Sequence, residues 1–215
     1  MPRFVPAEFG YDSLNPVVRE LLPPYVERAK VIDFLKGKQA QIEWVGLATG
    51  LDINRRLVDG NMGVDLAWQS ATVYGKGEDK FAASTPGFVG ELVKAVIENW
   101  ADFRNRYLCI SEVSTSYREI LDALERETES KFEVGYLEKE EGFNEAKRRI
   151  DGGWPDAGMF LMERAALANK ECFEGFARDE DVKATLKVHA HSLNSIVKDV
   201  VHDFNHHGKG GCGCS

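Results

Sequence analysis

The sequence lacks the features that identify secreted and membrane-spanning proteins. It has only four cysteines in 215 residues. These are too few and too scattered for the disulfide framework of a small secreted domain, so we expect reduced thiols. No run approaches the ~18 consecutive apolar residues of a membrane span, and no basic segment with an apolar core opens the chain. We therefore expect a cytoplasmic protein with no membrane partner.

Basic charge is also scarce. The 27 Lys and Arg side chains face 35 Asp and Glu, which leaves a net charge of -8, and no stretch gathers basic residues on one face. Such a chain is poorly suited to neutralising a row of phosphates, so we expect no direct nucleic-acid partner. Its content of 43% hydrophobic and 29% charged residues is ordinary for a globular chain. That is enough to bury one good core or two small ones.

Several catalytic motifs are missing as well. The sequence has no Gly-x-Ser-x-Gly elbow, and none of its six tyrosines is followed four residues later by a lysine. A serine hydrolase and the Tyr-Lys pair of the typical short-chain dehydrogenases therefore find no support. The glycine-rich turn of a dinucleotide-binding domain is absent after the first strand. The nearest candidate, "YGKGEDK", is followed by strand-like sequence, so we interpret it as a hairpin turn and not a phosphate loop.

The order of the predicted elements indicates an α/β fold. "RFVP" is typical of a short buried strand, "PPYVERAKVIDFLKGK" has apolar residues at helical spacing, and "IEWVGLATG" suits a strand buried on both faces of a parallel sheet. Strand, helix and strand in this order form one crossover unit of a doubly wound sheet. Thr85 before Pro86, and Ser116 three residues before Glu119, predict two further helix starts. "NRYLCIS" predicts another buried strand.

The loop after the first strand is the leading candidate site. Ligands of open α/β sheets bind at the carboxyl ends of the strands, which raises Glu8, Phe9 and Gly10 above ordinary turn residues. A plain turn that leads into the next helix explains them too. On that helix, a cation such as Arg28 could orient or polarise a carbonyl during reduction, but a solvated charged face is the alternative.

The C-terminal segment offers a weaker pattern. His202 and His206 lie four residues apart on a predicted helix, and Cys212 and Cys214 follow in a Gly-rich tail. No carboxylate or third histidine is fixed nearby by spacing, so a polar terminus is favoured over a metal site. The final "CGCS" has Gly and Cys where a prenylation box has an aliphatic pair, which disfavours lipidation.

Eight segments, taken in order, resemble a known family. The match covers nearly the whole chain, and its most specific part is the Arg-Phe-x-Pro-x-Glu-Phe-Gly element. The segments are "RFVPAEFGYDSLNP", "LPPYVERAKVIDFLKGK", "IEWVGLATGLD", "ATVYGKGEDKFAAST", "GELVKAVI", "NRYLCIS", "REILDALERETESKFEV" and "VKDVV". They are similar to the later two-thirds of fungal NmrA-like, isoflavone reductase-like proteins, an atypical short-chain dehydrogenase family. Its enzymes reduce phenylpropanoid-type and other aromatic small molecules with NADPH, whereas its NmrA branch binds dinucleotides to regulate transcription.

This resemblance implies a fold and a division into domains. We expect an α/β fold, consisting of the C-terminal part of a Rossmann-like, NAD(P)-binding doubly wound parallel sheet and a smaller α+β substrate domain. Residues 1–50 would hold the last strands of the NAD(P)-binding domain, and residues 51–205 the substrate-binding domain, with one strand at about 105–111 returning to the sheet. Residues 206–215 would form a flexible tail. In the family, roughly a hundred residues with the glycine fingerprint precede the Arg-Phe-x-Pro element. The chain would then be a truncated gene model, a shortened paralogue or a fragment.

The resemblance also implies roles for individual residues. The cofactor would be NADPH or NADH, with Phe9 and Gly10 of the Glu-Phe-Gly element near the nicotinamide ring. Thr49 and Gly50, after the next strand, would line the mouth for cofactor and substrate. In the reductases a lysine on the helix after Glu-Phe-Gly assists catalysis, and Arg28 takes that place here. Arginine keeps the charge but cannot act as an acid or base, so either it is an electrostatic helper or the catalytic role is lost.

Two hypotheses of function follow, with a small-molecule substrate as the expected partner. The first is an NAD(P)H-dependent reductase of a small aromatic or carbonyl compound that acts by hydride transfer. The second is a noncatalytic, NAD(P)-binding regulatory or protein-interaction protein of the NmrA type. A plain interaction domain without a ligand is a third, weaker alternative. The residues that could line an aromatic pocket, or equally belong to the core, are Met62, Trp68, Trp154, Met159 and Phe160.

The sheet that this resemblance implies has an open edge. The strands at Phe4-Val5, Val45-Ala48 and Tyr107-Ile110 would form one side of a sheet whose other side is not in the sequence. Unpaired backbone groups on an apolar edge invite pairing with another chain. We therefore expect a homo-oligomer.

Overall fold

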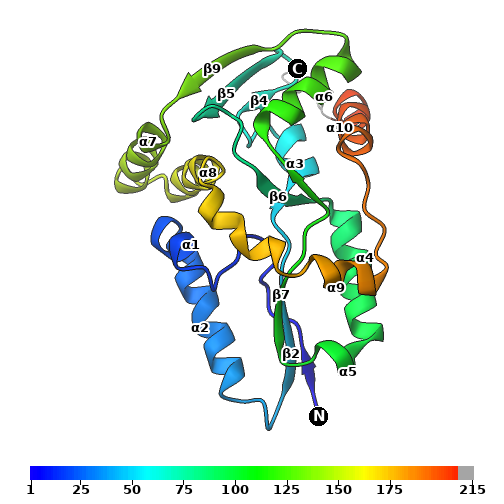
Figure 1. Cartoon of the computed structure of the whole chain (residues 1–215). Coiled ribbons are helices and arrows are strands. Elements are labelled where there is room, and N and C mark those ends of the chain that lie inside the picture. Colours follow the sequence, from blue (N-terminus) through cyan, green and yellow to red (C-terminus); the bar gives the residue numbers. More distant parts are fainter. Residues whose placement is uncertain (208–215) are drawn as a thin grey trace, which may run out of the picture.

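The chain folds around a small parallel sheet of three strands. The computed structural model describes residues 1–207. In the first sheet β1 (Arg3–Phe4), β2 (Glu43–Ala48) and β7 (Arg106–Cys109) are parallel in the order β1-β2-β7, and Phe4 lies opposite Trp44. Helices cover both faces, with α2 (Pro24–Lys36) on one side and α4 (Pro86–Glu98) on the other (Figure 1). The predicted α/β fold with a parallel sheet is confirmed.

Strand β2 is apolar on both faces because each face meets a different helix. Side chains alternate along a strand, so Trp44 packs on Ile32 of α2, whereas Val45 packs in a second cluster with Phe88 of α4. Helix α2 begins after Pro23 and ends before Gly37, whose N–H donates to the Asp33 carbonyl. The side chains of α2 that face the core are Tyr25, Ala29, Ile32 and Leu35, the spacing that the sequence predicted.

A second sheet continues from the first. It holds β3 (Leu51–Asp52), β6 (Phe81–Ser84) and β8 (Val113–Thr115) in the order β3-β6-β8; β3 runs parallel to β6, and β8 antiparallel. Helix α4 follows β6 and α6 (Tyr117–Thr128) follows β8. Both predicted helix starts are confirmed: Thr85 caps α4 with Pro86 at its first position, and Ser116 forms a capping box with Glu119 at the start of α6.

The predicted hairpin around Gly75 is wrong. Strand β5 (Ser70–Tyr74) pairs with β4 (Val64–Asp65) and β9 (Glu133–Leu137) in a third sheet, whereas β6 belongs to the second. Gly75 and Gly77 adopt positive φ angles of 68° and 71°, a conformation that glycine adopts without strain, and carry the chain from one sheet to the other. All four residues of β6 are buried, so this strand lies within the core and has no solvated face like that of a hairpin strand.

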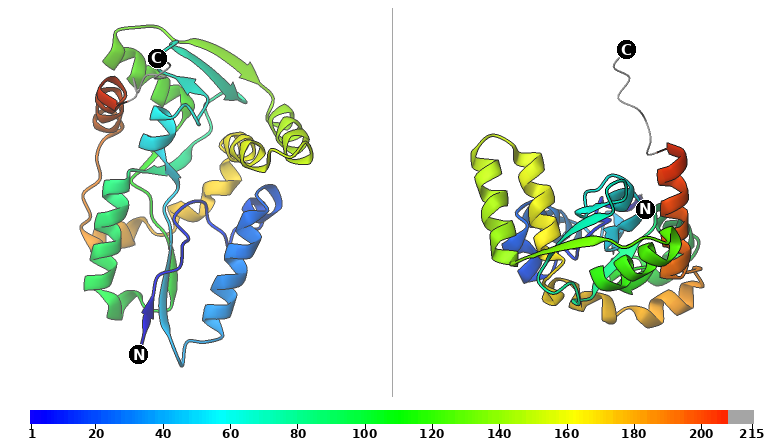
Figure 2. Two further views of the ribbon diagram at one scale, coloured as in Figure 1. Left: turned by 180° about the vertical axis from the view of Figure 1, so that it is seen from behind. Right: turned by 90° about the horizontal axis from the view of Figure 1, so that it is seen from above.

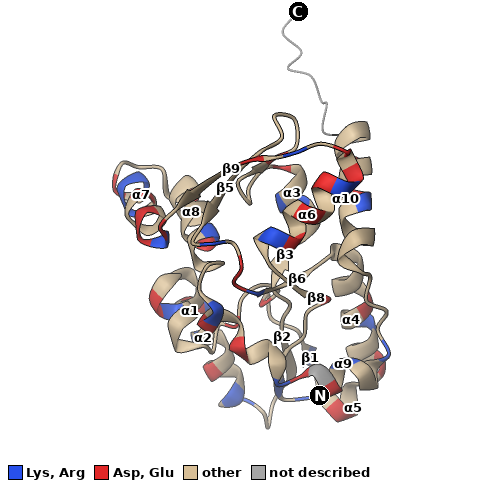
Figure 3. Cartoon of the chain, turned by 45° about the horizontal axis from the view of Figure 1, so that its top comes forward, with Lys and Arg blue, Asp and Glu red and all other residues tan. Residues whose placement is uncertain are grey.

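The remaining elements surround these sheets. They are α1 (Pro16–Leu21), α3 (Ile53–Val58), α5 (Trp100–Phe103), α7 (Lys139–Asp151), α8 (Pro155–Ala166), the 3-10 helix η1 (Lys170–Ala177), α9 (Glu180–Leu186) and α10 (Leu193–His207). Seen from above, α7 and α8 lie side by side at one end of the molecule and α10 at the other (Figure 2). Acidic and basic residues are interspersed along the helices (Figure 3). Within residues 1–207, no helix is long and apolar enough to cross a membrane. Cys212 and Cys214 lie outside the described residues.

The open edge of β1 predicts self-association. Within the described chain β1 pairs only with β2, and the apolar side chain of Phe4 on this strand is 43% exposed. We expect concentration-dependent species larger than the monomer in sedimentation velocity, and Phe4→Lys should shift the distribution towards monomer because a charged edge resists strand pairing. Trp68→Lys, at an exposed aromatic beside β4 and β5, is the control and should change nothing. A monodisperse wild-type monomer would contradict this expectation.

Candidate functional site

The loops that follow β1 and β2 are joined by backbone hydrogen bonds. The Gly10 carbonyl accepts the N–H groups of Thr49 and Gly50, at 3.1 and 2.9 Å. Gly50 has a φ of 74°, and a Cβ there would lie 2.4 Å from the Ala82 carbonyl oxygen, so only glycine fits. The two segments that the sequence singled out therefore lie together at the carboxyl ends of parallel strands.

A cavity of about 260 Å³ opens beside these loops, and we name it the α4 pocket because the first turn of α4 forms one wall. Three residues predicted to contact cofactor or substrate, Phe9, Thr49 and Gly50, line it. The sequence did not identify the other lining residues as part of a site: Asp52, Ser84, Thr85, Pro86 and Val89. Of these, only the helix-start pattern at Thr85 and Pro86 gave a local signal, and it indicated a cap, not a pocket.

Polar groups beneath the pocket hold its floor in place. The Ser84 hydroxyl donates to the Thr49 carbonyl at 2.6 Å and accepts the Glu112 N–H at 3.0 Å. With its N–H bound to Gly10 and its carbonyl bound to Ser84, the backbone of Thr49 is fixed. Thr49 is only 3% exposed as a residue, and its hydroxyl is not among the fully buried side-chain atoms that lack a hydrogen-bond partner in the described chain, which are Trp44 Nε1, Asn54 Oδ1 and Arg164 Nε.

Glu112 is a buried carboxylate behind the start of α4. It accepts the Thr85 N–H at 2.8 Å, the His191 N–H at 3.0 Å and a hydrogen bond with His191 Nδ1 at 2.7 Å. Burial alone would raise the pKa of Glu112, but the hydrogen bonds from His191 and Thr85 outweigh it, so the pKa lies below the ordinary value. The sequence did not identify Glu112, because its partners lie 27 and 79 residues away along the chain.

Glu8, Gly10 and Arg28 do not line the α4 pocket. The Glu8 side chain is buried and its Oε2 accepts the Tyr107 hydroxyl at 2.9 Å. Burial, and secondarily the Glu8 charge, raises the pKa of Tyr107. Arg28 Nη1 donates to the Glu8 carbonyl at 3.1 Å, and its guanidinium lies 4.6 Å from the centre of the Tyr25 ring. The structure thus places Arg28 behind the Glu-Phe-Gly loop, where it supports the loop backbone.

The five candidate pocket aromatics and methionines are not brought together. Met62 is fully buried in the main core, whereas Trp68 and Trp154 are 83% and 70% exposed. Phe160 is exposed and Met159 half-buried. The His202 and His206 rings stack with centroids 4.3 Å apart, but among the described residues no group of three His, Cys, Asp or Glu side chains is arranged to hold a metal ion.

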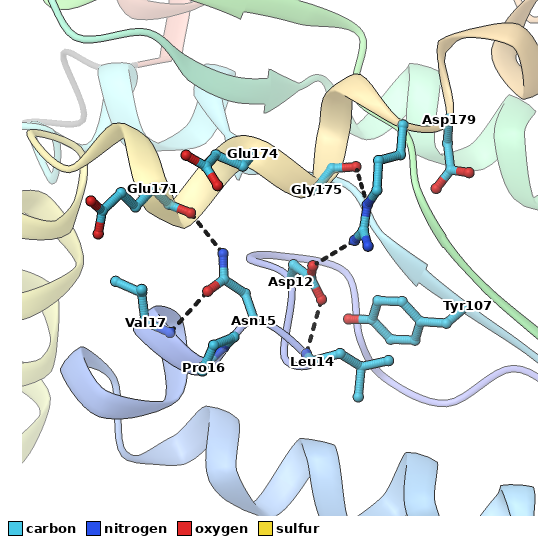
Figure 4. A pocket seen from close by; sticks show the side chains of 11 residues that line it. Asp12, Leu14, Asn15, Pro16, Val17, Tyr107, Glu171, Glu174, Gly175 and Asp179 are labelled. Carbon is cyan, nitrogen blue, oxygen red and sulfur yellow. Dashed lines mark hydrogen bonds and ion pairs between the residues drawn. The ribbon is translucent and has the colours of Figure 1, made fainter.

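A larger cavity of about 760 Å³ lies between the segment before α1 and η1 (Figure 4). Its lining is acidic, with Asp12, Glu171, Glu174 and Asp179. The polar groups of Asp12 and Asp179 are already engaged in the fold: Asp12 bonds to the Leu14 N–H and to Arg178, and Asp179 accepts the Cys109 N–H at 2.8 Å. Because none of the predicted site residues lines this cavity, the smaller α4 pocket is the stronger candidate.

Tight packing around Gly10 generates a prediction. A Cβ on Gly10 would lie 2.7 Å from the Tyr25 hydroxyl and 3.3 Å from Arg28 Nη1. Gly10→Ala should therefore lower the free energy of unfolding by about 1–3 kcal/mol. Removing the clashing oxygen by Tyr25→Phe should make the double variant more stable than the sum of the single effects. Denaturant unfolding of all four proteins measures this coupling.

Gly90→Ala provides the control, because nothing lies within 4 Å of a Cβ at this helical position. It should leave stability unchanged or raise it by up to about 1 kcal/mol. Strict additivity of Gly10→Ala and Tyr25→Phe would contradict the proposed clash.

Glu112 predicts a specific dependence of stability on pH. The pKa of Glu112 is lower in the native protein than in the unfolded chain, where it is about 4.3. The contribution of its carboxylate to the free energy of unfolding is therefore fully present above about pH 4.3 and is lost as the pH falls through the native pKa. Glu112→Gln should lower the free energy of unfolding by about 2 kcal/mol at pH 7, and the difference from wild type should shrink below about pH 4.3. Glu91→Gln, on the exposed face of α4, is the matched control. A difference that is constant from pH 7 to 3 would show that the carboxylate charge is not responsible.

Curated relatives of the chain are fungal oxidoreductases. No protein-family model matches it. It is 34% identical over 143 residues to Oxidoreductase aprR of Aspergillus flavus, a match that covers 65% of this chain and 47% of that protein. It is 28% identical over 96 residues to Oxidoreductase poxI of Penicillium oxalicum, covering 43% and 31%. The chain thus spans about half the length, or less, of these relatives.

Solved structures of plant and bacterial reductases share the fold. Isoflavone reductase superposes with a TM-score of 0.69 at 15% identity, over 92% of this chain and 65% of that one. The complex of leucoanthocyanidin reductase with NADPH from Vitis vinifera gives 0.71 at 14%, over 94% and 66%. The NADPH-dependent quinone oxidoreductase of Escherichia coli gives 0.67 at 16%, over 94% and 67%. The resemblance indicated by the motifs is therefore confirmed: the chain has the fold of the isoflavone reductase-like proteins, over about two thirds of their length.

Proposed function

We propose that this chain provides the nicotinamide and substrate end of an NAD(P)H-dependent reductase of a small aromatic or carbonyl compound. The observation that carries the proposal is the convergence of Phe9, Thr49 and Gly50, from the ends of two parallel strands, on one pocket at the start of α4. Ligands of open α/β sheets bind at such carboxyl ends. The fold shared with an NADPH complex and an NADPH-dependent oxidoreductase supports the same reading.

The residues of the pocket fit the nicotinamide end of the cofactor. Phe9 is 42% exposed and offers a ring against which a second flat ring can pack. Gly50 lets the loop pack closely on the Ala82 backbone, and the Thr49 hydroxyl in the pocket lining can bond a carboxamide or carbonyl group. NAD(P)H bound there would supply the hydride. The sequence has no glycine-rich turn for the pyrophosphate, so these residues would hold only one end of the cofactor.

Arg28 would act on the site through the loop and not by proton transfer. Its guanidinium bonds the Glu8 carbonyl, so it holds the backbone that carries Phe9 and places a positive charge behind it. The domain division at about residue 50 is part of the same proposal, with the pocket at the junction between the first and second sheets.

A noncatalytic role of the NmrA type is the second candidate, and Arg28 is the observation that favours it. The guanidinium is committed to the Glu8 carbonyl and the Tyr25 ring, and it cannot donate a proton at neutral pH. In this role the pocket would still bind nicotinamide but would not turn it over.

The first test is to measure the binding of reduced nicotinamide mononucleotide (NMNH) by its nicotinamide fluorescence, at fixed protein concentration. The sequence lacks the phosphate loop that would bind the pyrophosphate of NADPH. We therefore expect the adenosine end of NADPH to add few contacts, so that NMNH and NADPH bind with affinities within about threefold of each other. Phe9→Ala should weaken both by about tenfold through loss of stacking. Phe34→Ala, which removes an exposed aromatic of α2, is the control. Absence of saturable binding of either nucleotide would overturn the proposal.

Turnover then separates the two candidates. In the reductase, NADPH oxidation with aromatic aldehydes or quinones should depend on Phe9 and Thr49. In the noncatalytic protein, nucleotide binding should persist while neither wild type nor Arg28→Lys oxidises NADPH with any of these acceptors.

A further inference from the structure

We propose that the α4 pocket selects neutral aromatic carbonyl or carboxamide groups and rejects carboxylates, with Thr49 and Asp52 as the residues that determine this specificity. The inference rests on the proposed function for the role of the pocket, and it names the chemical class that the pocket takes. Three features carry it: the Thr49 hydroxyl in the pocket lining, the charge around the pocket and the apolar walls.

The first feature is the Thr49 hydroxyl. Its residue lines the pocket at 3% exposure, and both backbone groups of Thr49 are already bonded, to Gly10 and to Ser84. The hydroxyl is not one of the fully buried atoms of the described chain that lack a hydrogen-bond partner, so it is not a polar group sealed inside the core. A ligand oxygen in the pocket can therefore accept this O–H.

The second feature is the negative charge around the pocket. Asp52 lines it, and only one of its oxygens, Oδ1, has a partner among the described residues, the Arg55 N–H at 3.3 Å. The buried Glu112 carboxylate lies behind Thr85. No Lys or Arg is among the lining residues. A ligand carboxylate would meet the Asp52 carboxylate in a lining without Lys or Arg, with the Glu112 carboxylate, which is bonded to His191 and Thr85, behind the wall. Such a like-charge contact is unfavourable at a partly buried site.

The first turn of α4 does not reverse this charge. The N–H of Thr85 already donates to Glu112, and the Phe88 N–H donates to the Thr85 hydroxyl at 3.1 Å. Pro86, at the first helical position, has no N–H. Most of the donors that make a helix N-terminus attractive to anions are therefore engaged or absent here.

The third feature is the set of apolar walls. Phe9, Pro86 and Val89 surround a volume of about 260 Å³, below the roughly 300–1,000 Å³ of pockets for drug-sized ligands. One aromatic ring with a small substituent suits this space. A carboxamide on the ring can accept from Thr49 and donate its N–H to the free oxygen of Asp52, so both of its polar ends are satisfied. A carboxylate of the same shape can satisfy only the first contact.

Benzamide and benzoate provide a direct test, because they share size and shape and differ in charge. We expect saturation-transfer NMR at pH 7 with the 215-residue chain to show benzamide binding at least tenfold tighter than benzoate. Thr49→Val keeps the shape of the side chain and should weaken benzamide by about tenfold, the effect of one lost hydrogen bond. Asp52→Asn should bring benzoate to within about threefold of benzamide, and asparagine still caps α3. Asp102→Asn, on α5, is the control and should leave both affinities unchanged.

Two results would overturn the inference: benzoate binding as tightly as benzamide to the wild type, or absence of binding by both compounds. The outcome is separable from that of the proposed function. Selective benzamide binding together with no binding of NMNH would leave the selectivity standing and overturn the reductase. Binding of NMNH that benzoate and benzamide displace equally would support the reductase and overturn the selectivity.

Discussion

The hydroxyl of Ser84 joins the two bends on which the site depends. Strand β2 bends into β3 through Thr49 and Gly50, and β7 bends into β8 through residues 110–112. Ser84, at the end of β6, donates to the Thr49 carbonyl and accepts the Glu112 N–H, so a single side chain ties both bends together inside the fold. The bends carry Thr49, which lines the pocket, and the buried Glu112 carboxylate. Buried networks of this kind fix one arrangement when every member is bonded.

Glycine makes the close approach of these segments feasible. A side chain at Gly10 would clash with Tyr25 and Arg28 of α2, and one at Gly50 would clash with the Ala82 backbone of β6, so either would displace its loop from the neighbouring element. The closeness of the loops after β1 and β2 lets the Gly10 carbonyl accept two N–H groups at once. The Glu-Phe-Gly element therefore has two sides: Glu8 and Gly10 face inward as structural residues, and Phe9 reaches the pocket.

The charged groups on the two faces of the first sheet have different roles. On the side of α2, Arg28 supports the Glu8 backbone and Tyr107 bonds the Glu8 carboxylate. On the side of α4, Asp52 and Glu112 make the pocket negative without a basic residue in its lining. The cation that the motif suggested for catalysis thus bonds the backbone of the loop, while in the site that we propose the acidic groups near the pocket would decide which ligands fit.

The sequence by itself determined the local features: the strands β1, β2 and β7, the helix starts at Thr85 and Ser116, and Phe9, Thr49 and Gly50 as a group worth testing. These follow from side-chain periodicity, capping chemistry and a motif, all of which act over a few residues. The expectation that the first strand is buried was wrong, because both residues of β1 are exposed. Only the tertiary structure decided that β5 and β6 enter different sheets, that Arg28 lies behind the loop, and that Asp52, Ser84 and Glu112 surround the pocket. Those outcomes depend on contacts between residues 20 to 79 positions apart in the sequence. Such contacts are set by the packing of the whole core and cannot be predicted from the pattern of a few neighbouring residues.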